Sequence, residues 1–218
     1  MEKVDENIFI RSVLIPKYKM TKIKQNWLKI YTAVIEHGNV QIRFNPLNKC
    51  VEVKTETDQT DCKISLKEKG PENISLNRIY VDRCILFITA ILEGFKVDDS
   101  ISILKFKDVF IEKFEISEVR RMKANHLSRA IGRIVGRQGK VKETIENLSK
   151  VKFNLINNVI YLMGTTSSIV MAKDAIGRLI QGNAPNVIFN KLKIKTTKMK
   201  EKYGSLQSIY DDLRDDLD

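Results

Sequence analysis

The chain has few of the residues that bind transition metals or form disulfides. Its 218 residues include two histidines and three cysteines, Cys50, Cys62 and Cys84, and they contain no Cys-x-x-Cys pair. A zinc site therefore has almost no ligands to draw on, and we expect neither a metal nor another cofactor. Because the cysteines are odd in number and widely spaced, we expect reduced thiols packed inside a cytosolic or nuclear protein.

Long apolar runs are also absent. The longest mostly apolar segment, residues 84–92, would rise about 14 Å as a helix, whereas the hydrocarbon core of a membrane is about 30 Å thick. The chain begins with MEKVDE, which lacks the apolar segment of a secretory signal. We therefore expect a protein that is not inserted in a membrane and has no signal peptide.

Acidic residues are outnumbered by basic ones. There are 27 Asp and Glu against 38 Lys and Arg, which gives a formal net charge of +11. An excess of this size favours a polyanionic partner, either nucleic acid or an acidic membrane surface. Hydrophobic residues make up 43% of the chain, which is enough for a core and argues against global disorder.

The same order of expected elements occurs twice, which indicates an internal duplication. In the first half, periodicity and turn residues predict a strand at 8–15, a helix at 21–36, strands at 40–44 and 50–54, a loop at 55–76 and a helix at 77–93. In the second half they predict a strand at 109–119, helices at 127–135 and from 140 onward, strands at 152–156 and 159–163, and a helix at 166–181.

We therefore expect an α+β protein made of two tandem domains packed together. The first domain covers residues 8–95, a connector covers 96–106, and the second domain covers 107–184. In the helix at 21–36, the apolar spacing predicts one buried face made of Trp27, Ile30, Tyr31, Val34 and Ile35.

The C-terminal segment, residues 185–218, differs from the rest in its charge pattern. Residues 191–202 contain six Lys and one Glu, whereas residues 205–218 contain five Asp and one Arg. Blocks of like charge are usually solvated. We expect a charged, solvated tail, and the alternative is a working contact with a partner.

A turn with two glycines, Gly136-Arg-Gln-Gly139, separates the two helices of the second half. Glycines allow backbone angles that other residues avoid and let a partner approach the backbone. The next helix begins near Lys140, so its free N–H groups and positive dipole end face the turn. Residues 120–142 also contain eight Arg or Lys and no Asp or Glu. These features predict a clamp for the phosphates of single-stranded nucleic acid; the alternative is a glycine hinge beside a solvated basic face.

Other glycine-loop motifs do not fit this turn. A Walker phosphate loop or a dinucleotide-binding loop ending at Gly139 would need a glycine at position 134, where the chain has Ile134. Val141 also replaces the Ser or Thr with which a Walker loop holds magnesium. The turn is therefore neither a Walker loop nor a dinucleotide-binding loop.

The order of elements, with G-R-Q-G between two helices, resembles the eukaryotic-type K homology (KH) domain, a βααββα fold. In that family the clamp holds about four nucleotides by their backbone, and an apolar groove beside it receives the bases. Three longer stretches resemble the small-subunit ribosome assembly factors known as partners of the Nob endonuclease, across about residues 10–190. They are NWLKIYTAVIEHGNVQIRFN (26–45), KDVFIEKFEISEVRRMKANHLSRAIGRIVGRQGKVKETIEN (107–147) and AKDAIGRLIQGNAP (172–185).

This resemblance implies a non-catalytic RNA-binding factor of the nucleus, nucleolus and cytoplasm. Such a factor binds the 3′ region of the small-subunit rRNA precursor within the pre-ribosomal small subunit and assists its final 3′ cleavage by a Nob-type endonuclease. In the family the first repeat has lost its clamp, and residues 17–22 here contain no glycine. Archaeal relatives usually keep both clamps, so the chain resembles the eukaryotic type.

Two departures from the family pattern stand out. Val141 occupies a position where relatives often carry a hydroxyl residue, which weakens one expected phosphate contact. The N-terminal extension common in the family is almost missing, so no contact from it is expected.

We expect RNA contacts from the clamp, from the helix before it and from the strand beside the groove. These residues are Arg129, Arg133, Gly136, Arg137, Gln138, Gly139, Lys140, Lys142, Lys152 and Asn154. Ile134, Val135 and Leu155 form either the groove floor or the core. His126 is either a helix cap or an RNA contact, because no acid or cysteine stands near it in sequence for catalysis.

Two other functions remain as alternatives. One is a KH-domain regulator of messenger RNA, which the clamp-less first repeat disfavours because such regulators usually space active domains on flexible linkers. The other is a nuclease, which the sequence disfavours because it contains no metal cluster and no nucleophile–base pair. The paired acids Asp98-Asp99 and Asp211-Asp212 are expected to be helix-start and tail charges rather than magnesium ligands.

Overall fold

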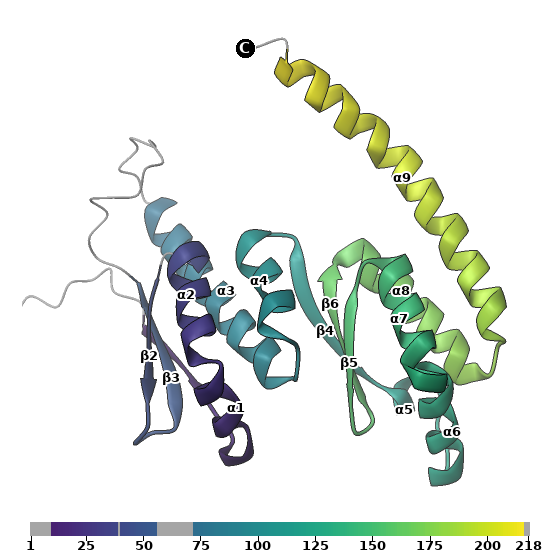
Figure 1. Cartoon of the computed structure of the whole chain (residues 1–218), viewed down its shortest axis with the longest axis horizontal. Coiled ribbons are helices and arrows are strands. Elements are labelled where there is room, and N and C mark those ends of the chain that lie inside the picture. The colour runs from purple at the N-terminus through teal and green to yellow at the C-terminus, as the bar shows by residue number, and fades with distance from the viewer. Residues whose placement is uncertain (1–9, 39, 56–71, 216–218) are drawn as a thin grey trace, which may run out of the picture. The chain divides into compact units, whose positions relative to one another are not determined.

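The computed structural model of the chain describes residues 10–38, 40–55 and 72–215 (Figure 1). The chain divides into two compact units, Met1–Ile111 and Glu112–Asp218. The start of the expected first strand and most of the expected loop at 55–76 lie outside the described residues.

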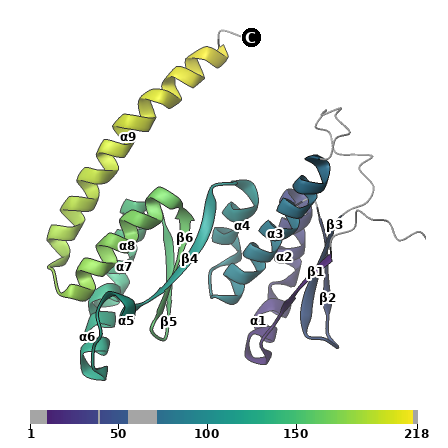
Figure 2. The same cartoon turned by 180° about the vertical axis from the view of Figure 1, so that it is seen from behind.

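The first unit contains a three-stranded sheet with helices on one face. Its elements are β1 (Ile10–Leu14), the 3-10 helix η1 (Lys17–Lys19), α1 (Met20–Gln25), α2 (Trp27–Gly38), β2 (Val40–Asn45), β3 (Cys50–Thr55), α3 (Glu72–Leu92) and α4 (Val97–Lys105). The strand order is β1-β3-β2 and both pairings are antiparallel. Two opposite views show α2 and α3 on the same face of this sheet (Figures 1 and 2).

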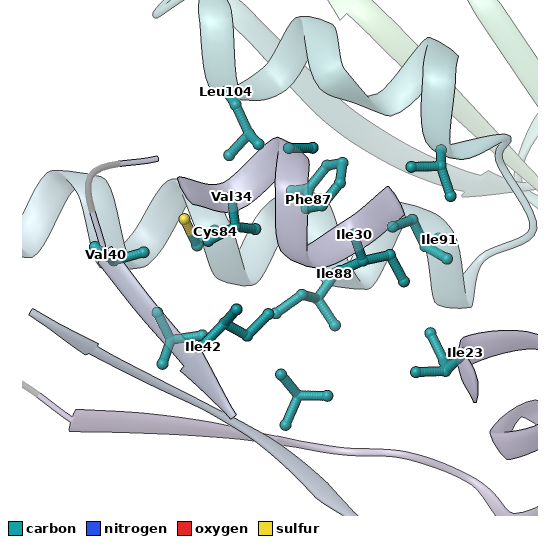
Figure 3. Packing of buried hydrophobic residues seen from close by; sticks show 14 of the residues in the cluster. Ile23, Ile30, Val34, Val40, Ile42, Cys84, Phe87, Ile88, Ile91 and Leu104 are labelled. Carbon is teal, nitrogen blue, oxygen red and sulfur yellow. The ribbon is translucent and has the colours of Figure 1, made fainter. Parts of the chain in front are cut away.

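The core of the first unit lies between this sheet and the helices on it (Figure 3). Phe87 and Ile88 of α3, Ile30 of α2 and Ile42 of β2 are buried members of one cluster (Figure 3). Burial of each such side chain contributes about 1.5–3 kcal/mol to folding. The packing is close enough that a Cβ atom at Gly38 would lie 2.9 Å from Sγ of Cys84.

The buried face of α2 differs from the one expected. Ile30 and Val34 are buried, but Tyr31 is 42% exposed and Ile35 is 49% exposed. The expected single helix is also broken, because Asn26 leaves the helical angles (φ −100°, ψ 8°) between α1 and α2. Ala33 is buried in place of Tyr31 and Ile35, so the face that α2 buries consists of Ile30, Ala33, Val34 and Gly38. Trp27 packs against the core, as expected, with its ring 5.9 Å from that of Phe44.

The segment expected as a connector, residues 96–106, contains the helix α4. Val97 and Ile103 are buried on it, and Asp98 and Asp99 stand in its first turn. Arg83 of α3 fixes its end by donating hydrogen bonds to the carbonyl oxygens of residues 103, 106 and 107. Tertiary packing stabilises this helix, which is too short to form alone.

The second unit repeats the same order of elements. They are β4 (Val109–Glu115), which begins just before the division between the units, α5 (Ile116–Val119), α6 (Ala124–Val135), the 3-10 helix η2 (Arg137–Gly139), α7 (Lys140–Ser149), β5 (Lys152–Ile156), β6 (Val159–Thr165), α8 (Thr166–Gln181) and α9 (Pro185–Asp215). The strand order is β4-β6-β5. With one βααββα set in each unit, the predicted α+β duplication is confirmed.

Within the expected charged tail, residues 185–215 form the long helix α9, and its first turns are packed on the second unit. Ile188 and Leu192 on its first turns are 1% and 3% exposed in the core of the second unit. The hydroxyl of Thr196 donates to the carbonyl oxygen of Leu148 in α7 (2.9 Å). This helix was missed from the sequence because the lysines dominate the segment. The apolar residues that dock it, Ile188 and Leu192, are spaced four apart among polar and charged residues.

None of the helices within the described ranges has the length and apolar character needed to cross a membrane. The described cysteines, Cys50 and Cys84, are free and buried, as expected, and Cys62 lies outside the described residues. Burial raises the pKa of the Cys84 thiol to about 12.

Candidate nucleic-acid interface

The loop between α6 and α7, residues 136–139, has an unusual backbone. Gly136 has φ 73° and ψ 179°, Gln138 has φ 55° and ψ 26°, and Gly139 has φ 77° and ψ 4°. Three of the four loop residues thus have positive φ, which residues with a side chain seldom adopt. The N–H groups of Gly136 and Gly139 donate to the carbonyls of Gly132 (2.8 Å) and Gly136 (3.3 Å).

The two glycines have different roles in this loop. Gly136 occupies a backbone region essentially restricted to glycine, and a Cβ atom there would lie 2.3 Å from Cγ2 of Val141. Beyond its chain neighbours, no described atom lies within 4 Å of the position of a Cβ at Gly139. Gly136 therefore lets the loop pack on the first turn of α7, whereas Gly139 leaves the backbone open to a ligand.

Positive charge gathers at the loop and at the start of α7. Arg137 and Lys140 are exposed, and neither is ion-paired to a carboxylate in the part of the chain that the structure describes. No side chain caps α7 at Gly139, so its positive dipole end faces the loop, while the N–H of Lys140 donates to the carbonyl of Arg137. The arrangement can therefore bind an anion through the helix dipole and two flanking cations.

Lys142 has partners of its own. Its Nζ atom lies 3.9 Å from a carboxylate oxygen of Glu146 and 5.2 Å from the centre of the Phe153 ring in β5. Glu146 in turn accepts a hydrogen bond from the N–H of Phe153 (2.9 Å). The charge of Lys142 is thus partly compensated, and its side chain reaches from α7 to β5.

Arg129 and Arg133 line a second feature, which we call the α6 basic pocket. This hollow of about 600 Å³ is lined by the polar and charged residues Arg120, Arg121, Lys123, His126, Arg129, Arg133 and Gln181, and by Met122, Ile180 and Gly182. The guanidinium of Arg133 is directed to the end of α8, 3.1 Å from the position of a Cβ at Gly182. The sequence counts Arg120, Arg121 and Lys123 in the basic run but does not assign them to a site.

Lys152 and Asn154 lie on β5, at the edge of the sheet. Side chains alternate along a strand, and Phe153 between them points into the core. Both residues therefore face the side of the sheet opposite to the helices. Ile134 is completely buried and belongs to the core, against which Leu155 packs from a partly buried position.

At the corresponding junction between α1 and α2, the first unit has no equivalent of the glycine loop. The single residue Asn26 joins α1 to α2, and its φ is −100°. No residue between Lys17 and Gly38 has positive φ. The side-chain amide of Asn26 donates to the carbonyl of Lys22 (2.9 Å), so the junction is closed on itself. This geometry agrees with the absence of glycine from residues 17–22.

His126 lies in the first turn of α6 and lines the α6 basic pocket. It is not the cap of this helix, because the capping position is Lys123, which makes no side-chain capping bond. Among the described residues, no three His, Cys, Asp or Glu side chains are grouped so that they could hold a metal.

Comparisons with known sequences match this chain along most of its length. A family model for the second KH domain of PNO1, described as Eukaryotic type KH-domain (KH-domain type I), matches residues 113–197. The pre-rRNA-processing protein PNO1 of Candida albicans is 37% identical over 193 residues, covering 88% of this chain and 64% of that protein. The RNA-binding protein PNO1 of Oryzias latipes is 34% identical over 194 residues, covering 89% of this chain and 73% of that protein. The chain thus spans a little under two thirds of the Candida protein.

Solved structures share the fold. A protein of unknown function from Aeropyrum pernix superposes with a TM-score of 0.70 at 18% identity, covering 93% of this chain and 98% of that one. Dim2p from Pyrococcus horikoshii gives a TM-score of 0.63 at 19% identity, covering 85% and 98%. A chain from the a/eIF2alpha–aDim2p–rRNA complex of the same organism gives 0.65 at 18% identity, covering 89% and 97%.

Proposed function

Since this chain belongs to the PNO1 family of KH-domain ribosome assembly proteins, we propose that it binds RNA and acts in pre-rRNA processing during assembly of the small ribosomal subunit. Its relatives are named as RNA-binding and pre-rRNA-processing proteins. The observation that carries the proposal is the loop 136–139, with its positive-φ backbone and its uncapped helix start.

In this proposal the loop holds the backbone of single-stranded RNA. A phosphate approaches Gly139, where no side chain stands in the way, and the positive dipole end of α7 stabilises its charge. Arg137 and Lys140 flank that phosphate, and Gln138 offers an amide to the sugar–phosphate chain. Arg129 and Arg133 on α6, and Lys142, Lys152 and Asn154 toward β5, extend the contact beyond the loop.

The finer role follows the family resemblance. We place the RNA at the 3′ region of the small-subunit rRNA precursor, within the pre-ribosomal small subunit, and the action beside a Nob-type endonuclease in the nucleus, nucleolus and cytoplasm. The chain itself is proposed to be non-catalytic. The first unit, whose helix junction is closed at Asn26, would then offer a surface to proteins rather than a second clamp.

Crosslinking in cells tests this role. Wild-type chain should crosslink to the small-subunit rRNA precursor near its mature 3′ end and co-purify with a Nob-type endonuclease. The matched control is the Arg137→Asp/Gln138→Asp variant, which should lose the RNA crosslinks. Crosslinks spread evenly over messenger RNAs would contradict the ribosomal role and favour a messenger RNA regulator.

A cleavage assay tests the proposed lack of catalysis. The purified chain should leave precursor RNA intact with magnesium or manganese. Added to the endonuclease and its substrate, it should change the rate or the site of cleavage. Metal-dependent cleavage by the pure chain, abolished by a point substitution in it, would contradict the proposal.

A further inference from the structure

The α6 basic pocket concentrates positive charge from two neighbouring segments of the second unit. Arg120, Arg121 and Lys123 come from the stretch between α5 and α6, and His126, Arg129 and Arg133 come from α6 itself. No Asp or Glu lines the hollow. None of the six side chains is ion-paired within the ranges that the structure describes.

The start of α6 adds to this field. Lys123 occupies the capping position without a side-chain capping bond, and the first turn contains no acidic residue. Helices usually begin with an acid or a hydroxyl that compensates the positive dipole end. Here cations surround that end, and a cleft lined by one sign of charge concentrates counter-ions of the other sign. The pocket is therefore built to receive an anion.

The shape of the pocket indicates what kind of anion it takes. All six basic residues are exposed, so their side chains stand at the rim of an open hollow. Enclosed sites that bury most of a small ligand are lined mainly by apolar groups, which this one is not. An open row of guanidinium groups instead suits an extended polyanion, because the paired N–H donors of each guanidinium can bind two oxygens of one phosphate.

The pocket and the clamp share one helix. From Lys123 at the start of α6 to Gly136 in the clamp there are thirteen residues, which correspond to about 20 Å along a helix. A backbone gripped at one end of α6 can thus continue along the helix to the other. We propose that the α6 basic pocket binds phosphodiester groups of the RNA that flanks the clamped nucleotides. This inference rests on the proposed RNA binding by the clamp.

Binding assays on the full chain separate the two sites. The pocket variant is Arg120→Glu/Arg121→Glu, two exposed residues that line the pocket, and it leaves Arg129 and Arg133 in place. The clamp variant is Arg137→Asp/Gln138→Asp. The charge control is Lys29→Glu/Lys113→Glu, two exposed residues outside both sites with the same change in net charge as the pocket variant. Circular dichroism of each variant shows whether it is folded.

The RNA probes differ in what lies beside the clamped segment. One probe has about six nucleotides, enough for the four that a KH clamp holds. A second adds about eight single-stranded nucleotides, and a third adds a hairpin instead. The last two distinguish a continuing single strand from a duplex as the source of the phosphates.

The wild type and the charge control should bind one of the extended probes more tightly than the short one. The pocket variant should bind the short probe normally but lose roughly tenfold affinity for that extended probe. Its salt dependence should flatten by about 0.7 in the log–log slope for each phosphate that the variant no longer binds. The clamp variant should lose affinity for all three probes.

The outcomes separate failure of the pocket from failure of the clamp. If the pocket variant matches the charge control on every probe while the clamp variant binds weakly, the pocket inference is wrong and the clamp stands. If the clamp variant binds all probes normally, the proposed clamp is wrong. A poly-glutamate peptide that binds the wild type as tightly as the extended RNA, but not the pocket variant, would overturn the assignment of RNA as the ligand.

Discussion

The isopropyl group of Val141 fills the space into which a side chain at Gly136 would project. A Cβ atom there would lie 2.3 Å from Cγ2 of Val141 and 2.7 Å from its Cβ. The valine at this position therefore holds the clamp loop against α7. This packing gives a structural role to a residue that the sequence comparison with the KH pattern marks as a departure.

Gly136→Ala should destabilise the second unit by about 2–3 kcal/mol, since it adds a clash to a forbidden backbone angle. Gly139→Ala should cost only about 1–2 kcal/mol, because it meets open space and suffers only the positive φ. Val141→Ala should not rescue Gly136→Ala, because the Cβ of residue 141 remains in the way. Hydrogen exchange of β5 and β6 amides measures these differences. Emission of Trp27, the only tryptophan, reports the first unit and should not change. Equal effects of the two glycine substitutions would contradict this account.

Arg137→Asp/Gln138→Asp should weaken binding of single-stranded RNA at least tenfold, or about 1.4 kcal/mol. Both side chains are exposed, and aspartate tolerates the left-handed angles of residue 138, so stability should change little. Fluorescence anisotropy at fixed salt measures the affinity. The control Thr21→Asp/Lys29→Asp changes net charge by the same amount on exposed positions of the first unit. Equal losses in the two variants would show that total charge, not the clamp, determines binding.

Leu192→Ala should destabilise the second unit by about 2–4 kcal/mol, because the leucine is 3% exposed in the core. Ile194→Ala on the same helix should change stability by less than about 0.5 kcal/mol, since Ile194 is 56% exposed. For the same reason, a fragment of residues 107–184 should be less stable than one of residues 107–200. Urea unfolding followed by circular dichroism compares these pairs. A fragment ending at 184 with full stability would show that α9 is dispensable.

The stability of the first unit should fall at high pH because of Cys84. Its pKa is raised by burial to about 12 in the folded chain, against 9.0 for a free thiol. Between these values the unfolded chain releases the proton and the folded chain keeps it, so the stability present below pH 9 declines as pH rises toward 12. Unfolding followed by Trp27 emission should show a steeper decline for the wild type than for Cys84→Ala. Identical slopes would mean that the thiol titrates alike in both states.

The sequence predicts well those parts of the fold whose ends are marked by residues typical of turns or helix ends. The helix at 166–181 ends at a glycine and matches α8, and the strand at 152–156 matches β5. The clamp loop is recognisable because its two glycines require special backbone angles. Each of these signals depends on a few neighbouring residues.

The parts that the sequence missed depend on distant packing. Tyr31 and Ile35 have the spacing of a buried face, but the sheet and the neighbouring helices cover Ile30, Ala33 and Val34 instead. Helix α9 is covered by lysines and is identified only by where Ile188 and Leu192 dock. The α6 basic pocket was missed because the end of α8, nearly sixty residues after Lys123, forms one of its walls. No local pattern contains that information.

Because α9 belongs to the core of the second unit, the two units become complete at different times during synthesis. The core of the first unit lies within residues 15–104, so all of its members have been made before the second unit begins. The core of the second unit includes Leu192, and the bond from Thr196 to α7 lies still later. A growing chain therefore finishes its first unit early. Helix α7, which follows the loop 136–139, packs against α9 only after nearly the whole chain has been synthesised.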